Sequence, residues 1–221
     1  MSSDLVLVPV FPLSGLVLFP HTRQLLHIFE ERYRQMTQDA LDGDGMIGLV
    51  LPRENAGEGS EPVPVYSIGC LGRITASRKL ADGRFLILLE GRTRFEIQGE
   101  EQTPKLYRVV RARLLEDLEF DELAPHDQAA LERARGDLES RMLDLTSALD
   151  PASVAALEDQ MRQLDPIQLT HALAFGLECS GVEKQVLLEA SDPVERCRQL
   201  IGLLDFHRIE SRLPDAPRTL N

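Results

Sequence analysis

Apolar and alternating stretches dominate the first half of the chain, and they predict β-strands. Residues 5–11 and 23–28 each have the pattern of a strand, and residues 30–41 then change to helical spacing. The apolar run at 46–51 ends at Pro52 and indicates another strand. Further strands are expected over residues 66–78, 84–90, 93–100 and 107–115. Six or seven short strands with one early helix predict a small mixed β-barrel.

Glycines within this region mark turns and bends. The sequence Ala81-Asp82-Gly83 is typical of a hairpin turn, because glycine tolerates the positive φ that a tight turn requires. Gly69 and Gly72 lie inside a predicted strand, and they indicate a bulge or sharp bend of the kind needed at a barrel corner.

The second half of the chain has the spacing of helices, with clear start signals. Asp150, Asp165 and Asp192 each precede a proline, which places a capping carboxylate before a proline in the first helical turn. Helices are expected over residues 125–148, 151–163, 166–178, 182–190 and 193–212. The prediction is therefore an α+β fold, with a barrel subdomain over 1–117, a helical subdomain over 118–213 and a flexible tail over 214–221.

Charge and cysteine usage narrow the possible functions. The formal net charge of the 221 residues is −12, and it arises from residues 116–221, because acids and bases balance over 1–115. An acidic surface repels phosphate backbones, which argues against nucleic acid as a partner of the second half. Cys70, Cys179 and Cys197 are too widely spaced for a disulfide framework or a metal motif. Without a signal peptide or a long apolar span, the chain is predicted to be cytoplasmic and not bound to a membrane.

No catalytic pattern emerges from the sequence. A glycine-lysine pair, which a phosphate-binding P-loop requires, does not occur, and neither does a GxSxG or HExxH motif. His21 and His27 could form a metal pair, and Cys70 could act as a nucleophile beside a histidine. Ordinary structural roles for all three residues explain the same pattern more simply. The sequence therefore predicts no enzyme activity, no cofactor and no metal.

Two groups of residues are candidates for binding. Arg73, Arg78, Arg92 and Arg94 lie on neighbouring predicted strands, together with Arg84. They form either a patch for RNA or a small anionic ligand, or the polar face of a half-solvated sheet that pairs with Glu90 and Glu96.

The second group is the loop of Leu16, Val17, Leu18 and Phe19, which lies between Pro12 and Pro20. Connecting loops are normally polar, and this one is apolar. It either plugs one end of the barrel or lines an exposed groove that binds peptides.

Several segments in order resemble one protein family. PVFPLSGLVLFP, IFEERYRQM, GLVLP, IGCLGRI and DGRFLILLEGRTRFEI, together with the later VLLEASDPVERCRQLIGLL, are similar to the amino-terminal domain of the ATP-dependent protease Lon. The resemblance implies a PUA-like barrel followed by a helical bundle, with a role in recognising protein substrates in protein quality control. The ATPase and the serine-lysine proteolytic site of that family lie in other domains. The expectation is a stand-alone, non-catalytic domain that binds a protein or peptide partner.

Overall fold

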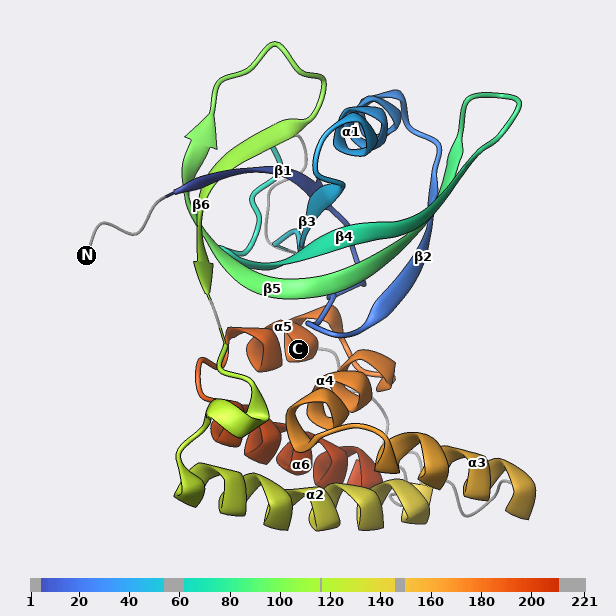
Figure 1. Cartoon of the computed structure of the whole chain (residues 1–221), viewed down its shortest axis with the longest axis vertical. Coiled ribbons are helices and arrows are strands. Elements are labelled where there is room, and N and C mark those ends of the chain that lie inside the picture. The colour runs from blue at the N-terminus through green and yellow to red at the C-terminus, as the bar shows by residue number, and fades with distance from the viewer. Residues whose placement is uncertain (1–4, 54–61, 116, 146–149, 211–221) are drawn as a thin grey trace, which may run out of the picture. The chain divides into compact units, whose positions relative to one another are not determined.

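In the computed structural model, which describes residues 5–53, 62–115, 117–145 and 150–210, the first half of the chain forms a mixed six-stranded sheet (Figure 1). Its strands are β1 (Val6–Pro12), β2 (Arg23–Ile28), β3 (Met46–Val50), β4 (Ile68–Lys79), β5 (Phe85–Glu101) and β6 (Arg108–Leu115). The order is β2-β5-β4-β3-β1-β6, and β5 also pairs with β6, so five strands close into a barrel and β2 extends it beside β5. Among the strands that the structure describes, only β1 and β3 run parallel. The predicted α+β barrel is confirmed.

Strand β5 is longer than the sequence predicts. The two strands expected at 84–90 and 93–100 are one continuous strand, and this corrects the prediction of a break between them. A Cβ atom at Gly91 would lie only 2.1 Å from the carbonyl oxygen of Phe19. Glycine therefore does not end the strand here. It lets the backbone of another segment approach β5 where that strand changes partners from β2 to β6.

The barrel interior is filled by the inward-facing residues of the strands. Its core contains Val8, Val10, Val50, Leu71, Phe95, Val110 and Ala112. The register between β4 and β5 shifts at Leu71 and Gly72, as the glycine pattern predicts. Gly83 in the β4–β5 turn has a φ of 82°, which confirms the predicted hairpin turn.

The helices are α1 (Glu31–Asp42), α2 (Pro125–Leu145), α3 (Pro151–Arg162), α4 (Pro166–Gly176), α5 (Gly181–Glu189) and α6 (Pro193–Glu210), with a short 3₁₀ turn at Phe120–Glu122. The capping carboxylates act as predicted: Asp150 accepts hydrogen bonds from the backbone N–H groups of Ala152 and Ser153 at 3.0 Å. Helix α5 begins with a reciprocal capping box between Ser180 and Glu183. Within the described part of the chain, no helix is long and apolar enough to cross a membrane.

The chain divides into two compact units. The first contains residues 1–117 together with 171–189, and the second contains residues 118–170 and 190–221. The sequence prediction assigned residues 171–189 to the helical subdomain, whereas they lie here with the barrel. Gln185 of α5 donates a hydrogen bond from Nε2 to the carbonyl oxygen of Ile68, at 2.9 Å. Side chains of α5 are thus part of the packing of the first unit.

Candidate functional site

The four arginines predicted to form an anionic patch do not lie in one environment. Arg73 and Arg78 are exposed, and neither forms an ion pair with a residue that the structure describes. Arg92 forms an ion pair with Glu90 at 2.9 Å. Arg94 is buried, with 4% of its side chain exposed, and its guanidinium binds Asp117 through both Nε and Nη2 and the Leu188 carbonyl oxygen through Nη1. The unbroken arginine surface that RNA would need is therefore not formed by these four residues.

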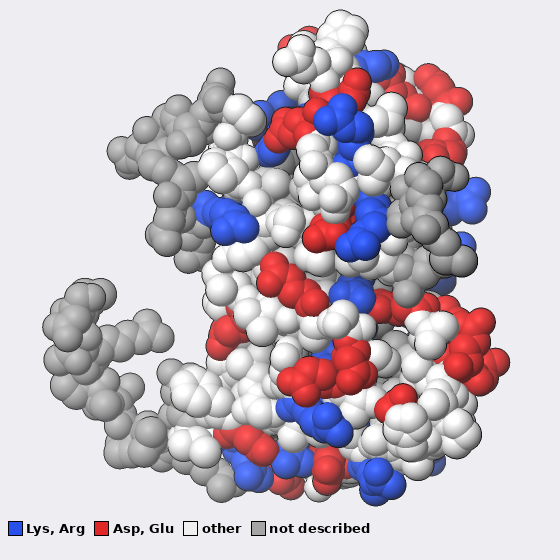
Figure 2. All heavy atoms as spheres, turned by 90° about the vertical axis from the view of Figure 1, so that its left-hand side faces the viewer, with Lys and Arg blue, Asp and Glu red and all other residues white. Residues whose placement is uncertain are grey.

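Charged side chains of both signs also share the face of the molecule that Figure 2 presents. Basic and acidic groups are interspersed there, without a broad area of positive charge. Surface ion pairs also link neighbouring strands, as in Arg113 with Glu96 at 2.6 Å. Neither observation favours a ligand with many negative charges.

The apolar loop predicted to bind peptides is mostly interior. Val17, Leu18 and Phe19 are buried, with 3%, 1% and 0% exposed, and only Leu16 is half-buried. Of the two alternatives for this loop, the plug fits the burial. Thr22 holds it in place, because its hydroxyl donates a hydrogen bond to the Phe19 carbonyl oxygen at 2.7 Å. A direct role of the loop in binding stays a prediction, and in this conformation Leu16 alone could reach a ligand.

The residues considered for catalysis do not form a site. Cys70 is buried, and its thiol donates a weak hydrogen bond to the Leu71 carbonyl oxygen. His21 stacks on His171, while the His27 ring lies 5.9 Å from the Phe29 ring. The structure therefore gives the two histidines different neighbours. In the described ranges, no group of three potential metal ligands occurs.

The outer face of the sheet formed by β2, β5 and β4 carries an apolar surface that the sequence prediction missed. Leu25 on β2 lies directly opposite Leu88 on β5, which lies opposite Ala76 on β4. The next row contains His27, Leu86 and Arg78. Phe29 follows at the end of β2. We call these seven residues the outer sheet face: Leu25, His27, Phe29, Ala76, Arg78, Leu86 and Leu88.

Two large side chains of the outer sheet face are strongly exposed. Leu25 is 63% exposed and Phe29 60%, and Leu86 and Leu88 are half-buried beside them. Sheets with one solvated face normally place polar residues on that side. These apolar side chains point away from the barrel core, and their exposure makes the outer sheet face a candidate interaction surface.

A charged border lies at one end of the outer sheet face. Arg23 is opposite Glu90, which is opposite Arg73, so an acid lies between two bases across three strands. Arg23 binds Glu90 at 2.7 Å, and Arg92 binds the same carboxylate. Three arginines (Arg23, Arg73 and Arg92) surround the single acid Glu90, so the border carries more positive than negative charge.

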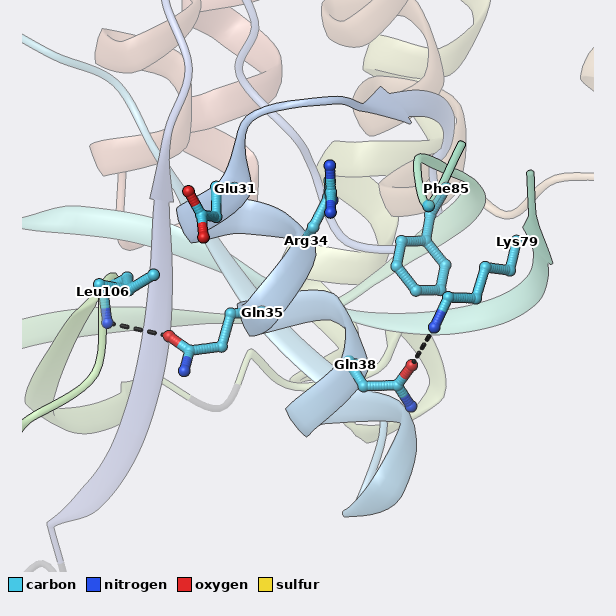
Figure 3. Close-up of a pocket in the computed structure, with 8 residues that line it drawn as sticks. Glu31, Arg34, Gln35, Gln38, Lys79, Phe85 and Leu106 are labelled. Atoms are coloured by element: carbon cyan, nitrogen blue, oxygen red, sulfur yellow. Dashed lines mark hydrogen bonds between the residues drawn. The ribbon is translucent and has the colours of Figure 1, made fainter. Parts of the chain in front are cut away.

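A cavity of about 340 Å³ lies between α1 and the β4–β5 hairpin (Figure 3). The side chains of Gln35 and Gln38 reach from α1 toward it. Gln38 accepts a hydrogen bond from Lys79, and Gln35 accepts one from the backbone N–H of Leu106. Lys79 also lies 5.1 Å above the Phe85 ring. Several of its polar groups thus bind each other and attach α1 to the barrel.

A second cavity, of about 560 Å³, borders β1 and the start of α1 and β6. Its walls include Pro12, Pro52 and Tyr107. Burial and the neighbouring Asp39 raise the pKa of Tyr107 to about 12, so its hydroxyl remains a hydrogen-bond donor at neutral pH. The two arginines that line this cavity, Arg32 and Arg108, are already paired with Glu30 and Glu100.

Comparison with known proteins gives a consistent result over nearly the whole chain. Residues 7–205 match the family model of the ATP-dependent protease La (LON) substrate-binding domain. The Lon protease of Trichlorobacter lovleyi is 28% identical over 216 residues, which cover 96% of this chain and 26% of the protease. The Lon protease of Escherichia coli is 26% identical over 215 residues, with the same coverage. The chain thus spans about a quarter of the length of these relatives.

Solved structures show the same fold. The amino-terminal domain of a Lon protease from the Mycobacterium avium complex superposes with a TM-score of 0.71 at 19% identity, covering 91% of this chain and 100% of that domain. A Lon N-terminal domain protein from Xanthomonas campestris gives a TM-score of 0.59 at 20% identity, covering 95% and 99%.

Proposed function

The chain belongs to the family of Lon substrate-binding domains, as its sequence motifs predict, and on this premise we propose that it binds polypeptides without catalysing a reaction. The ligand is an apolar segment of an unfolded or unassembled protein. The matched family is that of the substrate-binding domain, and the family model covers residues 7–205. Recognition of protein is therefore the function that the family membership supports.

The observation that carries this proposal is the exposed apolar surface on the outer sheet face. Covering the side chains of Leu25 and Phe29 would contribute on the order of 1–2 kcal/mol each, since more than half of each is accessible to water. Leu86 and Leu88 would add smaller areas beside them. Because each contact is weak, a ligand must cover several of these side chains together, which an unfolded segment with clustered apolar residues can do.

We further propose that the apolar loop of residues 16–19 supports the outer sheet face from inside the barrel. Leu18 packs near Gly72, where a Cβ atom would lie 3.1 Å from Leu18 Cδ2 and 2.6 Å from Leu89 Cγ. Leu89 follows Leu88 along β5 and points to the opposite face of the sheet. The buried loop thus fixes the strands whose outer side chains would contact the ligand.

The test is the replacement Leu25→Asp, with Leu7→Asp as its matched control. Both leucines lie on strands and are similarly exposed, at 63% and 61%, and Leu7 belongs to β1, outside the outer sheet face. Binding of fluorescein-labelled α-lactalbumin that has been reduced and carboxymethylated would be followed by fluorescence anisotropy. We expect Leu25→Asp to weaken binding about tenfold or more and Leu7→Asp to change it less than about twofold.

Two results would contradict the proposal. Failure of the parent protein to bind the unfolded probe at micromolar concentration would show that the proposed function is wrong. Equal binding by the parent and by a folded Leu25→Asp variant would remove the outer sheet face as the site. Circular dichroism of each variant establishes that it is folded.

A further inference from the structure

The backbone of β2 presents one row of hydrogen-bonding groups to β5 and another away from it. The backbone N–H of Gly91 donates a hydrogen bond to the Thr22 carbonyl oxygen at 2.9 Å, so this carbonyl group points toward β5. Its direction determines which of the following residues in β2 also point their backbone groups toward β5. In an antiparallel pair, every second residue exchanges hydrogen bonds with its partner strand. Gln24, Leu26 and Ile28 therefore bond to β5, and the N–H and C=O groups of Arg23, Leu25 and His27 point toward the opposite edge.

That opposite edge of β2 is not paired within the described part of the chain. Strand β2 is the last strand in the sheet order, with β5 as its one strand partner there. The Leu25 carbonyl oxygen instead accepts a hydrogen bond from the Gln24 side chain at 2.8 Å, as expected for a group that no strand reaches. A side-chain amide of this kind can be displaced by a backbone N–H group.

Few of the devices that normally protect an edge strand are present in β2. Such strands usually carry lysine, proline or a bulge, which prevent another chain from pairing with them. Strand β2 has neither lysine nor proline between Arg23 and Ile28, and its register with β5 is regular over all six residues. Leu25 is exposed in the middle of this edge, and Phe29 lies just beyond its end.

We propose that an extended polypeptide segment binds by adding a strand to the free edge of β2, with its alternate apolar side chains on the outer sheet face. This rests on the proposed function and specifies how the ligand is held. Backbone hydrogen bonds to Arg23, Leu25 and His27 accept any sequence, while the apolar contacts select segments with an apolar residue at every second position.

Charge distinguishes this ligand from a second copy of the same chain. Two β2 strands paired antiparallel about Leu25 would place Arg23 of one copy opposite His27 of the other, so no acid would meet either arginine. Arg73 and Arg78 add positive charge on the same side of the sheet, and no ion pair is formed by them with the residues described. A segment with an acidic residue beside its apolar positions complements this border.

The edge is tested by His27→Pro, with His27→Ala as its matched control. Proline removes the backbone N–H of residue 27, which points to the free edge, and leaves the hydrogen bonds between β2 and β5 intact. Alanine removes the same side chain and keeps the N–H. The probe is a fluorescein-labelled peptide of alternating valine and threonine with a glutamate at each end. We expect the His27→Pro variant to bind the peptide about tenfold more weakly than the His27→Ala variant, because both lack the imidazole and only the proline variant also lacks the N–H group.

Hydrogen exchange of the parent protein provides a test that does not depend on how the proline variant folds. The amides of Arg23, Leu25 and His27 should exchange quickly in the free protein and become protected on addition of the peptide. Those of Gln24, Leu26 and Ile28 should be protected in both states. If peptide binding increases the protection of neither set of amides, or increases that of both sets equally, strand addition is wrong.

The outcomes separate the two proposals. If Leu25→Asp weakens binding of unfolded α-lactalbumin but a folded His27→Pro variant binds like His27→Ala, strand addition is wrong and the proposed function stands. If the parent binds neither probe, both are wrong. If sedimentation shows a dimer of the parent that His27→Pro abolishes, the edge serves a second copy and the polypeptide ligand is excluded from it.

Discussion

Arg92 and Arg94 are two residues apart on one strand, yet they have opposite environments. Arg92 is exposed beside Glu90, and Arg94 is buried against Asp117 and the end of α5. The period of a strand predicts the side to which each residue points. It cannot predict the register shift that leaves Arg92 without a partner on β4, or the helix over residues 181–189 whose Leu188 carbonyl oxygen binds Arg94. The sequence therefore predicts that these arginines lie on neighbouring strands, but it does not predict that Arg92 is exposed and Arg94 buried.

Replacement of Arg94 should be much more damaging than replacement of an exposed arginine. Arg94→Ala leaves the Asp117 carboxylate, 16% exposed, without this partner, and the expected loss is about 3–5 kcal/mol in the free energy of unfolding. Arg23→Ala breaks an ion pair whose arginine side chain is 66% exposed, and it should cost less than about 1 kcal/mol. Urea denaturation followed by circular dichroism measures both, and similar losses would show that the Arg94 contacts do not support the fold.

The apolar residues of the outer sheet face leave a weak signal in the sequence. Residues 85–89 read Phe-Leu-Ile-Leu-Leu, with no polar residue on either face of the strand. A strand with one solvated side should alternate, so this run indicates that both sides of the strand meet apolar partners. The interior accounts for Phe85, Ile87 and Leu89. Only the strand register shows that Leu86 and Leu88 lie beside Leu25 on the surface.

At the scale of elements, the helix starts were predictable because their chemistry is local. A capping carboxylate and the N–H groups it binds lie within three residues, as for Asp165 with Ile167 and Gln168. The continuity of β5 through Gly91 was not predictable in this way. The reason for a glycine at this position is the close approach of the Phe19 carbonyl oxygen, which comes from a distant part of the sequence.

Gly91→Ala should destabilise the protein, and Gly136→Ala should not. At Gly91 the added Cβ would meet backbone atoms of Phe19 at 2.1 and 2.9 Å, so the loop or the strand must move, at a cost of about 3 kcal/mol. Gly136 lies exposed in α2, and no atom outside its own stretch of helix backbone lies within 4 Å of the added methyl, so alanine there should stabilise the helix by about 0.5–1 kcal/mol. Thermal unfolding of the two variants compares these effects, and an unchanged midpoint for Gly91→Ala would contradict the close approach.

At the scale of the whole molecule, the first unit is assembled from two separate parts of the sequence. Residues 171–189 pack with residues 1–117, and Leu187 and Leu188 are each 2% exposed. Helical spacing predicted α5, but the sequence contains no local sign of which other elements its apolar residues contact. That information comes from long-range contacts such as Gln185 with Ile68.

Truncation of side chains in α5 should therefore weaken the barrel itself. Replacing Leu187 and Leu188 by alanine removes two buried side chains, and each should cost about 2–5 kcal/mol. Val186→Ala is the control, because Val186 lies on the same helix and is 51% exposed. Hydrogen exchange of the β4 and β5 amides is the measurement. If those amides keep their protection in the double variant, α5 does not contribute to barrel stability.

The closure of the barrel also sets the order of events while the chain is being synthesised. Val6 pairs with Ala112, so the first strand must wait for the last before the sheet can close. The contact of Gln185 with Ile68 can form only after residues 118–170 have left the ribosome. The nascent chain thus exposes the apolar residues of its barrel until β6 has been synthesised, and folding is limited by pairing between distant residues. A domain proposed to bind unfolded chains must itself pass through such a state.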